Sequence, residues 1–250
     1  MFKVLTYLLK GNLKKFFVSL IHWINHFLDK RRMRNIFKPI SKNLLTNQKD
    51  YRSITYKNFN YKNYVYRNMF EKYKSNKGGY FERNNTIRHF YADFYEESLI
   101  NIKIENMLEI GIEYGGSLRA WSELFPKSNI FGADINSEYL FNEPKIKTFY
   151  TNQLDKNELN NLYNKLKDIK FDVIIDDGLH TYQANINTFE ILYPLLDKQN
   201  GNYFIEDIIF KDLKKYYDYF GNKYNIKIVE CLNANENYQN CLIHIKNNNI

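Results

Sequence analysis

Five apolar segments of strand length alternate with helical patterns between residues 106 and 208. These segments are NMLEIGI (106–112), NIFGADI (129–135), IKTFYT (146–151), FDVIID (171–176) and NYFIEDI (202–208). Between them lie SLRAWSELF, LDKNELNNLYNKLK and TYQANINTFEILYPLLDK, the last running from Thr181 to Lys198. Strands that alternate with helices form parallel sheets with right-handed crossovers, and strands that are apolar throughout are buried on both faces. The chain is therefore predicted to have an α/β fold with a mostly parallel sheet.

The last two apolar segments follow a different pattern. IKIVEC (226–231) and CLIHIK (241–246) are joined by the turn-rich LNANENYQN, which predicts an antiparallel hairpin. A parallel sheet binds ligands at the carboxyl ends of its strands, near the point where the strand order reverses. The residues that follow each parallel strand are therefore the candidates for a binding site.

The basic charge of the chain is confined to its N-terminal segment. Of the 36 Lys and Arg and 28 Asp and Glu residues, residues 1–50 hold 11 and 2, which leaves 25 and 26 in residues 51–250. The body carries no basic-aromatic recognition motif, so we expect no nucleic-acid partner. Two cysteines are too few for a disulfide framework, which favours a reducing compartment, the cytoplasm.

Residues 1–34 predict a basic amphipathic helix. The longest run without charge, residues 16–28, has 13 residues, whereas a bilayer span needs about 20. Two alternatives are open: a helix at the inner face of the membrane, or a helix that packs on its own domain or on a second subunit, which leaves a homo-oligomer open. Residues 35–70 are predicted to be a linker with short helices, and residues 71–250 to form the compact domain.

A glycine-rich loop follows the first strand, in LEIGIEYGGS. Gly111, Gly115 and Gly116 allow a tight turn and the close approach of a ligand, and Ser117 begins a helix whose N-terminus attracts an anionic group. Asp134 ends the second strand, where an acidic residue accepts the hydroxyls of a ribose. Together they predict a nucleoside ligand, with a plain glycine loop as the alternative. Because the pattern is not GxGxxG, a dinucleotide is disfavoured.

Acidic residues follow the fourth and fifth strands. Asp176, Asp177 and His180 lie in DDGLH, and Glu206 and Asp207 lie at the end of the fifth strand. Neighbouring strands would bring Asp177, Glu206 and Asp207 together, and a hard cation such as Mg²⁺ or Mn²⁺ would offset their repulsion. His180, one short turn after Asp177, is the candidate general base. The alternative is that these carboxylates cap the following helices and that His180 has no chemical role.

The combination resembles the class I S-adenosylmethionine (SAM)-dependent methyltransferases. LEIGIEYGGS is similar to the first motif of metal-dependent O-methyltransferases. DDGLH…FEILYPLLDKQNGNYFIEDI resembles DDGSH…F..L.P.L..GG.Y.IEDL of the macrolide-sugar O-methyltransferases and the cephalosporin hydroxylase-like family, and SNKGG…HFYADFYE (75–96) is similar to their TDKG…H.Y...YE. The resemblance covers roughly residues 72–210. It implies a Rossmann-like methyltransferase sheet. The C-terminal antiparallel hairpin and the N-terminal helical extension are predicted from the residues themselves, and the N-terminal 70 residues do not resemble the family.

The resemblance also implies roles for individual residues. It places Mg²⁺ on Asp177, Glu206 and Asp207, and it makes Asp177 and His180 the catalytic residues. The implied contacts to SAM come from Glu109, Gly111, Gly115, Ser117 and Asp134. TNQLD resembles the family's GDQ.D, which puts Asn152 and Gln153 near the adenine. Two residues depart from the family pattern: Asn152 replaces an Asp, which weakens that assignment, and Leu179 replaces a Ser, which removes a hydroxyl.

The implied activity is SN2 methyl transfer from SAM to a hydroxyl of a sugar, a glycan precursor or a glycosylated small molecule. The cation would hold the acceptor oxygen, and His180 would take its proton. The nearest alternative is a catechol-type O-methyltransferase, which would use the metal in the same way but act on an aromatic diol. The alternative from another class is a non-catalytic, membrane-associated binding protein with the same fold. The acceptor, the regiochemistry and the oligomeric state are left open by the sequence.

Overall fold

The computed structural model describes residues 54–55, 65–78, 91–209, 212–221, 223–230 and 239–246. The chain divides into two compact units, Met1–Tyr51 and Arg52–Ile250, and all described residues lie in the second. The amphipathic helix predicted for residues 1–34 and most of the predicted linker lie outside the described residues and stay predictions. Within the described part, no helix is long and apolar enough to cross a membrane.

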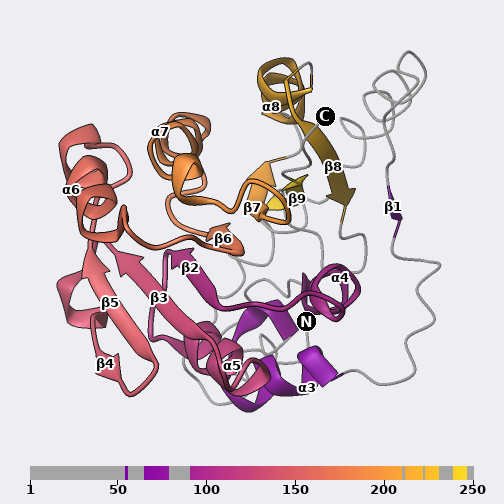
Figure 1. Ribbon diagram of the computed structural model, residues 1–250. Coiled ribbons are helices and arrows are strands. Elements are labelled where there is room, and N and C mark those ends of the chain that lie inside the picture. Colours follow the sequence, from indigo (N-terminus) through magenta and orange to yellow (C-terminus); the bar gives the residue numbers. More distant parts are fainter. Residues whose placement is uncertain are drawn as a thin grey trace, which may run out of the picture. The chain divides into compact units, whose positions relative to one another are not determined.

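The described strands form one sheet in the order β1-β8-β9-β7-β6-β2-β3-β5-β4 (Figure 1). Their bounds are β1 Ile54–Thr55, β2 Asn106–Ile110, β3 Asn129–Asp134, β4 Asn142–Glu143, β5 Ile146–Tyr150, β6 Val173–Asp176, β7 Asn202–Ile209, β8 Asn225–Glu230 and β9 Gln239–Lys246. Strands β5, β3, β2, β6 and β7 run parallel, whereas β9 is antiparallel to both β7 and β8. The predicted parallel sheet and C-terminal hairpin are therefore confirmed.

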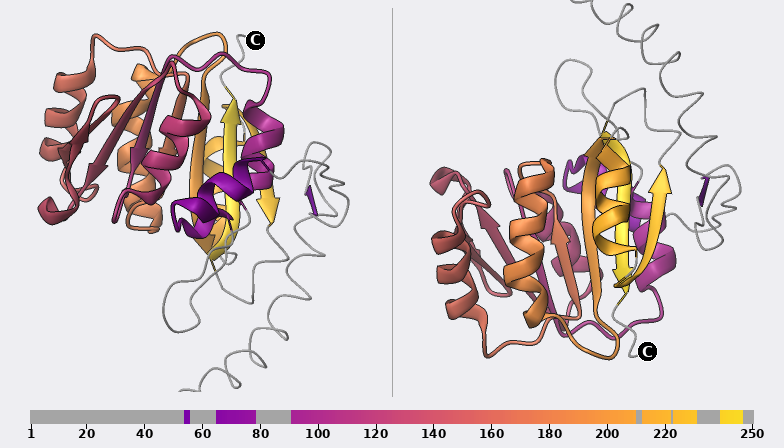
Figure 2. Two further views of the ribbon diagram at one scale, coloured as in Figure 1. Left: turned by 90° about the horizontal axis from the view of Figure 1, so that it is seen from below. Right: turned by 90° about the horizontal axis from the view of Figure 1, so that it is seen from above.

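Helices cover both faces of the sheet. The α-helices are α3 Val65–Lys72, α4 Tyr91–Leu99, α5 Gly116–Leu124, α6 Lys156–Leu166, α7 Tyr182–Leu192 and α8 Leu213–Phe220, and the 3₁₀ turns are η2 Asn76–Gly78, η3 Ser137–Tyr139 and η4 Tyr193–Leu195. Helices α6, α7 and α8 lie on one face, and α3, α4 and α5 lie on the other (Figures 1 and 2).

The helix predicted to end at Lys198 is shorter than expected. Its α-helical part ends at Leu192 and is followed by the 3₁₀ turn η4. The reason is Pro194, which has no N–H to donate to the helical ladder and whose ring clashes with the preceding turn.

An aromatic cluster joins the helices of one face to the sheet. The fully buried ring of Trp121, on α5, makes edge contacts with Phe70 at 4.7 Å, Tyr95 at 5.1 Å and Tyr66 at 6.1 Å between centroids. The side chains of the central strands β2 and β6 are buried on both faces. Helix α3 thus contributes Tyr66 and Phe70 to the core from within the stretch predicted to be a linker with short helices.

The strand order reverses at β2, which has β3 on one side and β6 on the other. The Gly111 N–H donates to the Ala133 carbonyl at 2.8 Å, and the Asp177 N–H donates to the Ile110 carbonyl at 2.8 Å. These bonds extend the parallel pairing one residue past the end of β2. They bring the segments after β2, β3 and β6 side by side at the carboxyl edge of the sheet.

Candidate active site

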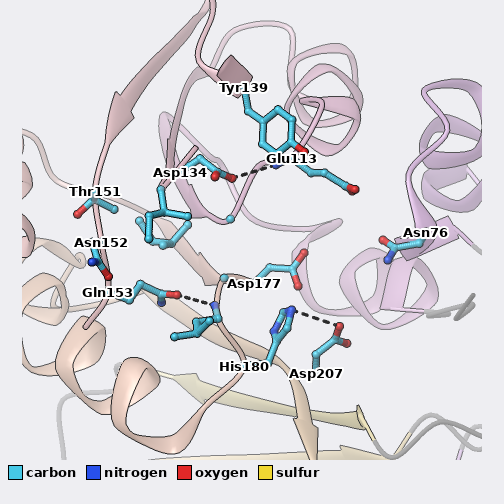
Figure 3. A pocket seen from close by; sticks show the side chains of 15 residues that line it. Asn76, Glu113, Asp134, Tyr139, Thr151, Asn152, Gln153, Asp177, His180 and Asp207 are labelled. Carbon is cyan, nitrogen blue, oxygen red and sulfur yellow. Dashed lines mark hydrogen bonds and ion pairs between the residues drawn. The ribbon is translucent and has the colours of Figure 1, made fainter. Parts of the chain in front are cut away.

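A cleft of about 430 Å³ opens at this edge (Figure 3). It lies where the strand order predicts a ligand site. The residues that line it are Asn76, Ile110, Gly111, Glu113, Asp134, Ile135, Tyr139, Thr151, Asn152, Gln153, Asp177, Gly178, Leu179, His180 and Asp207. Seven of the residues predicted as site residues are in this set: Gly111, Asp134, Asn152, Gln153, Asp177, His180 and Asp207.

Two glycines let the chain segments at the cleft approach each other. Gly111 has a φ of 86°, and a Cβ there would lie 2.1 Å from the carbonyl oxygen of Asp177. A Cβ on Gly178 would lie 2.0 Å from Gln153 Oε1. A side chain at Gly111 would therefore push the ends of β2 and β6 apart. Gly115 also has a positive φ, but the space beside it is filled by the ring of Phe141 rather than by the cleft.

Two of the predicted cofactor contacts lie beneath the cleft. Glu109 is fully buried, where its Oε2 accepts from Trp121 Nε1 at 3.1 Å and its Oε1 lies 3.3 Å from Lys77 Nζ. Ser117 is buried in the first turn of α5, where its hydroxyl opposes the rise that burial causes in the pKa of Glu109. The structure does not bring either side chain to the cleft surface, and their roles toward a cofactor stay predictions.

Asp134 fixes the glycine-rich loop to the end of β3. Its Oδ2 accepts from the N–H groups of Ile112 at 2.9 Å and Glu113 at 3.1 Å, and its Oδ1 accepts from the Asn136 N–H at 2.8 Å. A carboxylate has about four lone-pair sites, so these three bonds leave capacity for a ligand hydroxyl. Asp134 is therefore both a loop anchor and a polar group in the cleft wall.

Gln153 holds the turn that follows β6. Its Nε2 donates to Asp176 Oδ1 at 2.6 Å and Thr188 Oγ1 at 2.8 Å, and its Oε1 accepts from the Leu179 N–H at 2.7 Å. The polar atoms of Gln153 are thus used within the protein. The residue lines the cleft, and its contact with an adenine stays a prediction. The neighbouring Asn152 uses its Oδ1 to accept from the Leu154 N–H at 3.0 Å.

Asp177, His180 and Asp207 form a cluster in the cleft wall (Figure 3). One ligand atom from each lies within 4.8 Å of the others, and His180 Nε2 is 3.8 Å from Asp207 Oδ2. His180 and Asp207 both have a φ of 56°, a left-handed conformation that is costly for residues other than glycine. At Asp207 the strand pairing shifts between Ile205 and Ile208, as in a β-bulge. Backbone strain of this kind concentrates at functional sites.

Glu206 lies one layer deeper than Asp207. Its Oε2 accepts from Lys77 Nζ at 2.8 Å, and its Oε1 accepts from the Tyr95 hydroxyl. Lys77 Nζ also donates to Asp177 Oδ2 at 2.5 Å. The left-handed φ of Asp207 and the shifted pairing after Ile205 break the alternation of a regular strand, so both carboxylates reach helix α4, where Tyr95 bonds Glu206 and Tyr91 bonds Asp207. The three predicted metal ligands are therefore connected, but Glu206 reaches Asp177 through Lys77 rather than across the cleft.

Comparison with known proteins identifies relatives of this chain. No protein-family model matches it. It is 31% identical over 129 residues to the 8-demethyl-8-(2-methoxy-alpha-L-rhamnosyl)-tetracenomycin-C 3'-O-methyltransferase of Streptomyces olivaceus, which covers 48% of this chain and 32% of the relative. It is 30% identical over 138 residues to the mycinamicin VI 2''-O-methyltransferase of Micromonospora griseorubida, with coverage of 52% and 34%. Over this stretch the chain is similar in sequence to sugar O-methyltransferases.

The homology is partial. The demethylmacrocin O-methyltransferase of Streptomyces fradiae is 33% identical over 129 residues, and the chain again spans about a third of the relative's length, 32%. Among solved structures, the MycE methyltransferase of the mycinamycin biosynthetic pathway, in complex with Mg and SAH, is 27% identical with a TM-score of 0.48, and it covers 63% of this chain and 39% of that chain.

Three residues at this site have no role predicted from the sequence: Lys77, Tyr91 and Tyr95. The Tyr91 hydroxyl donates to Asp207 Oδ1 at 2.7 Å, and Tyr95 donates to Glu206. The sequence does carry a signal for them. Tyr91 and Tyr95 are four residues apart on one helix face, and Lys77 precedes two glycines in SNKGG, so both stretches belong to segments that resemble the methyltransferase family.

Burial sets the protonation of the cluster. Burial and the negative charge of Asp177 raise the pKa values of Glu206 and Asp207 well above their usual range. Burial alone would lower the pKa of Lys77, but Asp177, Glu206 and Glu109 outweigh it and keep the ammonium charged. Burial lowers the pKa of His180, so its imidazole is neutral at neutral pH. Such a site releases protons when it takes up a cation.

Proposed function

We propose that this chain transfers a methyl group from SAM to a hydroxyl of a sugar, in a glycosylated small molecule, with the help of Mg²⁺ or Mn²⁺. The observation that carries the proposal is the cluster of Asp177, His180 and Asp207 in a cleft shared with Gly111 and Asp134. The homology to macrolide-sugar O-methyltransferases supports it. Because the chain spans about a third of those relatives, its activity and acceptor are proposals in their own right.

The cleft suits a nucleoside cofactor. Its volume of about 430 Å³ is within the range of small-molecule sites. Gly111, Asp134 and Asn152 line the cleft. We infer that the Asp134 carboxylate would accept from ribose hydroxyls and that Asn152 would contact the adenine. When bound, SAM supplies a methyl group activated by its sulfonium.

The donor set suits a hard divalent cation. Asp177 and Asp207 offer carboxylate oxygens, which Mg²⁺ and Mn²⁺ prefer, and the ligand atoms in the cluster lie within 4.8 Å of one another. Glu206 would complete the predicted set by sharing its carboxylate with Lys77. When bound, the cation lowers the pKa of a coordinated hydroxyl.

His180 is the proposed general base. Because its imidazole is neutral at neutral pH, Nε2 can accept the proton of the acceptor hydroxyl. The resulting imidazolium lies 3.8 Å from Asp207 Oδ2, and it would be stabilised by that carboxylate in its ionised form. The fixed turn from Asp177 to His180 keeps the proposed ligand and the base in one orientation.

The names of the relatives point to the acceptor class. They describe enzymes that methylate a rhamnosyl tetracenomycin, mycinamicin VI and an olivosyl-oleandolide. We infer that the acceptor of this chain is likewise a sugar hydroxyl on a larger molecule.

The test is a methyl-transfer assay with SAM, Mg²⁺ and a panel of acceptors, followed by mass spectrometry. The panel contains rhamnosylated polyketides, nucleotide sugars and catechols, and matched reactions contain EDTA. Methylation of a carbohydrate that EDTA abolishes is the expected result. Methylation of catechols alone would favour the aromatic-diol alternative, and absence of SAM binding in calorimetry would favour the non-catalytic alternative.

A further inference from the structure

A lysine is buried directly behind the proposed catalytic cluster. The side chain of Lys77 is 1% exposed, and its Nζ lies 2.5 Å from Asp177 Oδ2, 2.8 Å from Glu206 Oε2 and 3.3 Å from Glu109 Oε1. These carboxylates come from the ends or interiors of three neighbouring strands, β6, β7 and β2. One ammonium therefore links the acidic groups of three strands.

The segment that carries Lys77 is built to direct it inward. The Ser75 N–H donates to the Phe70 carbonyl at 2.9 Å, and the Gly78 N–H donates to the Ser75 carbonyl at 3.3 Å. A Cβ on Gly78 would lie 2.8 Å from both the Arg67 carbonyl oxygen and the Phe70 Cβ, so a larger residue would displace the turn. The preceding residue, Asn76, lines the cleft (Figure 3), whereas Lys77 does not.

Because Lys77 does not reach the cleft surface, it cannot touch an acceptor or a cofactor there. Its surroundings hold the carboxyl groups of Glu109, Asp177, Glu206 and Asp207. Burial raises the pKa values of Glu109, Glu206 and Asp207, and when all four groups are ionised a single ammonium offsets one of the four charges. A divalent cation and the sulfonium of SAM would offset the remaining three. The positive and negative charges are thus equal when both proposed ligands are bound. Of the positive charges, only that of Lys77 comes from the protein.

We propose that Lys77 is a positioning residue, an internal counterion that keeps Asp177 and Glu206 together before the divalent cation binds. The inference rests on the proposed function, because it concerns the same cation site. The cation would then bind to carboxylates that Lys77 already holds together, and its binding would not be what brings them together. It also means that the ammonium and the cation repel each other, so Lys77 moderates the affinity of the site.

Lys77→Met tests this in the full chain, with Lys74→Met as the matched control. Lys74 is an exposed lysine of the same segment. Without a cation, the Lys77 variant should melt about 10 °C or more below the wild type, since it leaves buried carboxylates uncompensated. Mg²⁺ should raise its melting temperature by more than it raises that of the wild type. In calorimetry at pH 8, Lys77→Met should bind Mg²⁺ roughly tenfold more tightly, or more, than the wild type does. The control should match the wild type in every measurement.

Two further variants separate charge compensation from simple packing. Lys77→Met combined with Glu206→Gln removes one positive and one negative charge, so it should melt higher than Lys77→Met alone. Lys77→Arg keeps the charge, and its Mg²⁺-induced melting shift should stay close to that of the wild type. If Lys77→Met unfolds during purification, the double variant carries the comparison.

The possible results are distinct. If the wild type responds to Mg²⁺ and Lys77→Met responds to the same extent, Lys77 has no connection to the cation site and the inference is overturned. If Glu206→Gln lowers the melting temperature of the Lys77 variant further, the counterion role is overturned as well. If no variant, wild type included, responds to Mg²⁺ or Mn²⁺, then the cation of the proposed function fails, and the inference fails with it.

Discussion

His180 and Asp177 lie on one turn, but their surroundings differ, in keeping with the proposed roles of His180 as a general base and Asp177 as a cation ligand. Asp177 is held by Lys77 from behind, at 2.5 Å. His180 is mostly buried, adopts a left-handed backbone conformation and faces Asp207. The two residues should therefore fail differently when they are changed.

We expect His180→Ala to lose on the order of 10²–10⁴ in methyl-transfer rate, the usual contribution of a positioned base, with SAM affinity unchanged in calorimetry. Asp177→Asn should lose cation-dependent activity that excess Mg²⁺ partly restores.

Wild-type activity should fall as the pH drops through the pKa of His180, which burial lowers below its ordinary value of about 6.5. A wild-type rate in the His180 variant would place the base elsewhere.

His244, on β9, gives a second pH prediction. It is stacked on Phe204 at 4.4 Å, and its Nε2 lies 2.9 Å from Asn202 Oδ1. Burial lowers the pKa of His244 to about 3, with Lys227 and Lys246 adding to the effect. Between that value and the unfolded value of about 6.5, the folded state binds fewer protons than the unfolded state. Stability from this group is therefore complete above the unfolded pKa and falls as the pH drops below it.

The measurement compares the wild type with His244→Gln by urea unfolding at pH 7.5 and pH 5.5. Over this interval the wild type should lose about 1.4 kcal/mol relative to the variant. Other groups with shifted pKa values, such as Asp176, are common to both proteins and cancel in the difference. A difference in unfolding free energy that is the same at both pH values would show that His244 does not titrate in this way.

At the scale of elements, the sequence predicts the sheet well because buried parallel strands are continuous apolar runs bounded by polar residues. It predicts the α-helices less completely. Helix α8 buries Leu213, Tyr216 and Phe220, but its pattern is hidden among lysines and tyrosines. The two acidic residues at the end of β7 could be placed at the site, but a bulge and a positive φ decide which of them faces the cleft. Neither feature is readable from local spacing.

The position of Lys77 could not be predicted from local sequence patterns either, because its partners lie far away in the sequence. It lies 100 positions before Asp177, so local periodicity cannot reveal their contact. The tertiary packing of α3 on α5 brings its segment under the sheet. The candidate cleft was thus predictable from the strand ends, whereas the layer that supports the cleft was not.

Gln153 tests how far the turn after β6 depends on that supporting layer. Gln153→Leu should lower the free energy of unfolding by about 2–4 kcal/mol, because the fully buried side chains of Asp176 and Thr188 both lose a partner. Asn152→Ala is the matched control, since its side chain bonds the N–H of an exposed residue, and it should cost less than about 1 kcal/mol. Chemical denaturation measures both. Equal losses in the two variants would mean that Gln153 does not hold the turn.

At the scale of the whole molecule, the question is where the catalytic unit begins. Tyr66 and Phe70 are 5% and 0% exposed, and the Tyr66 N–H donates to Glu96 Oε2 at 3.1 Å. Strand β1 adds a further contact, since it pairs with β8. We therefore propose that the unit needs residues on the N-terminal side of position 71, and that residues 1–34 are dispensable for its folding.

Two truncations test this boundary, one beginning at residue 52 and one at residue 73. The longer chain keeps α3 and should melt close to the full chain. The shorter chain loses Tyr66 and Phe70, whose side chains are each worth about 3–5 kcal/mol when buried, and it exposes Trp121. Because a domain has only about 5–15 kcal/mol of stability, the shorter chain should be largely unfolded in circular dichroism. The melting temperature of Phe70→Ala in the full chain should fall between those of the two truncations.

Sedimentation with anionic vesicles tests membrane binding by residues 1–34. We expect the full chain to pellet with the vesicles and the chain that begins at residue 52 to stay in solution. A folded chain from residue 73 would return the boundary to position 71, and equal sedimentation of both chains would remove the membrane role of residues 1–34.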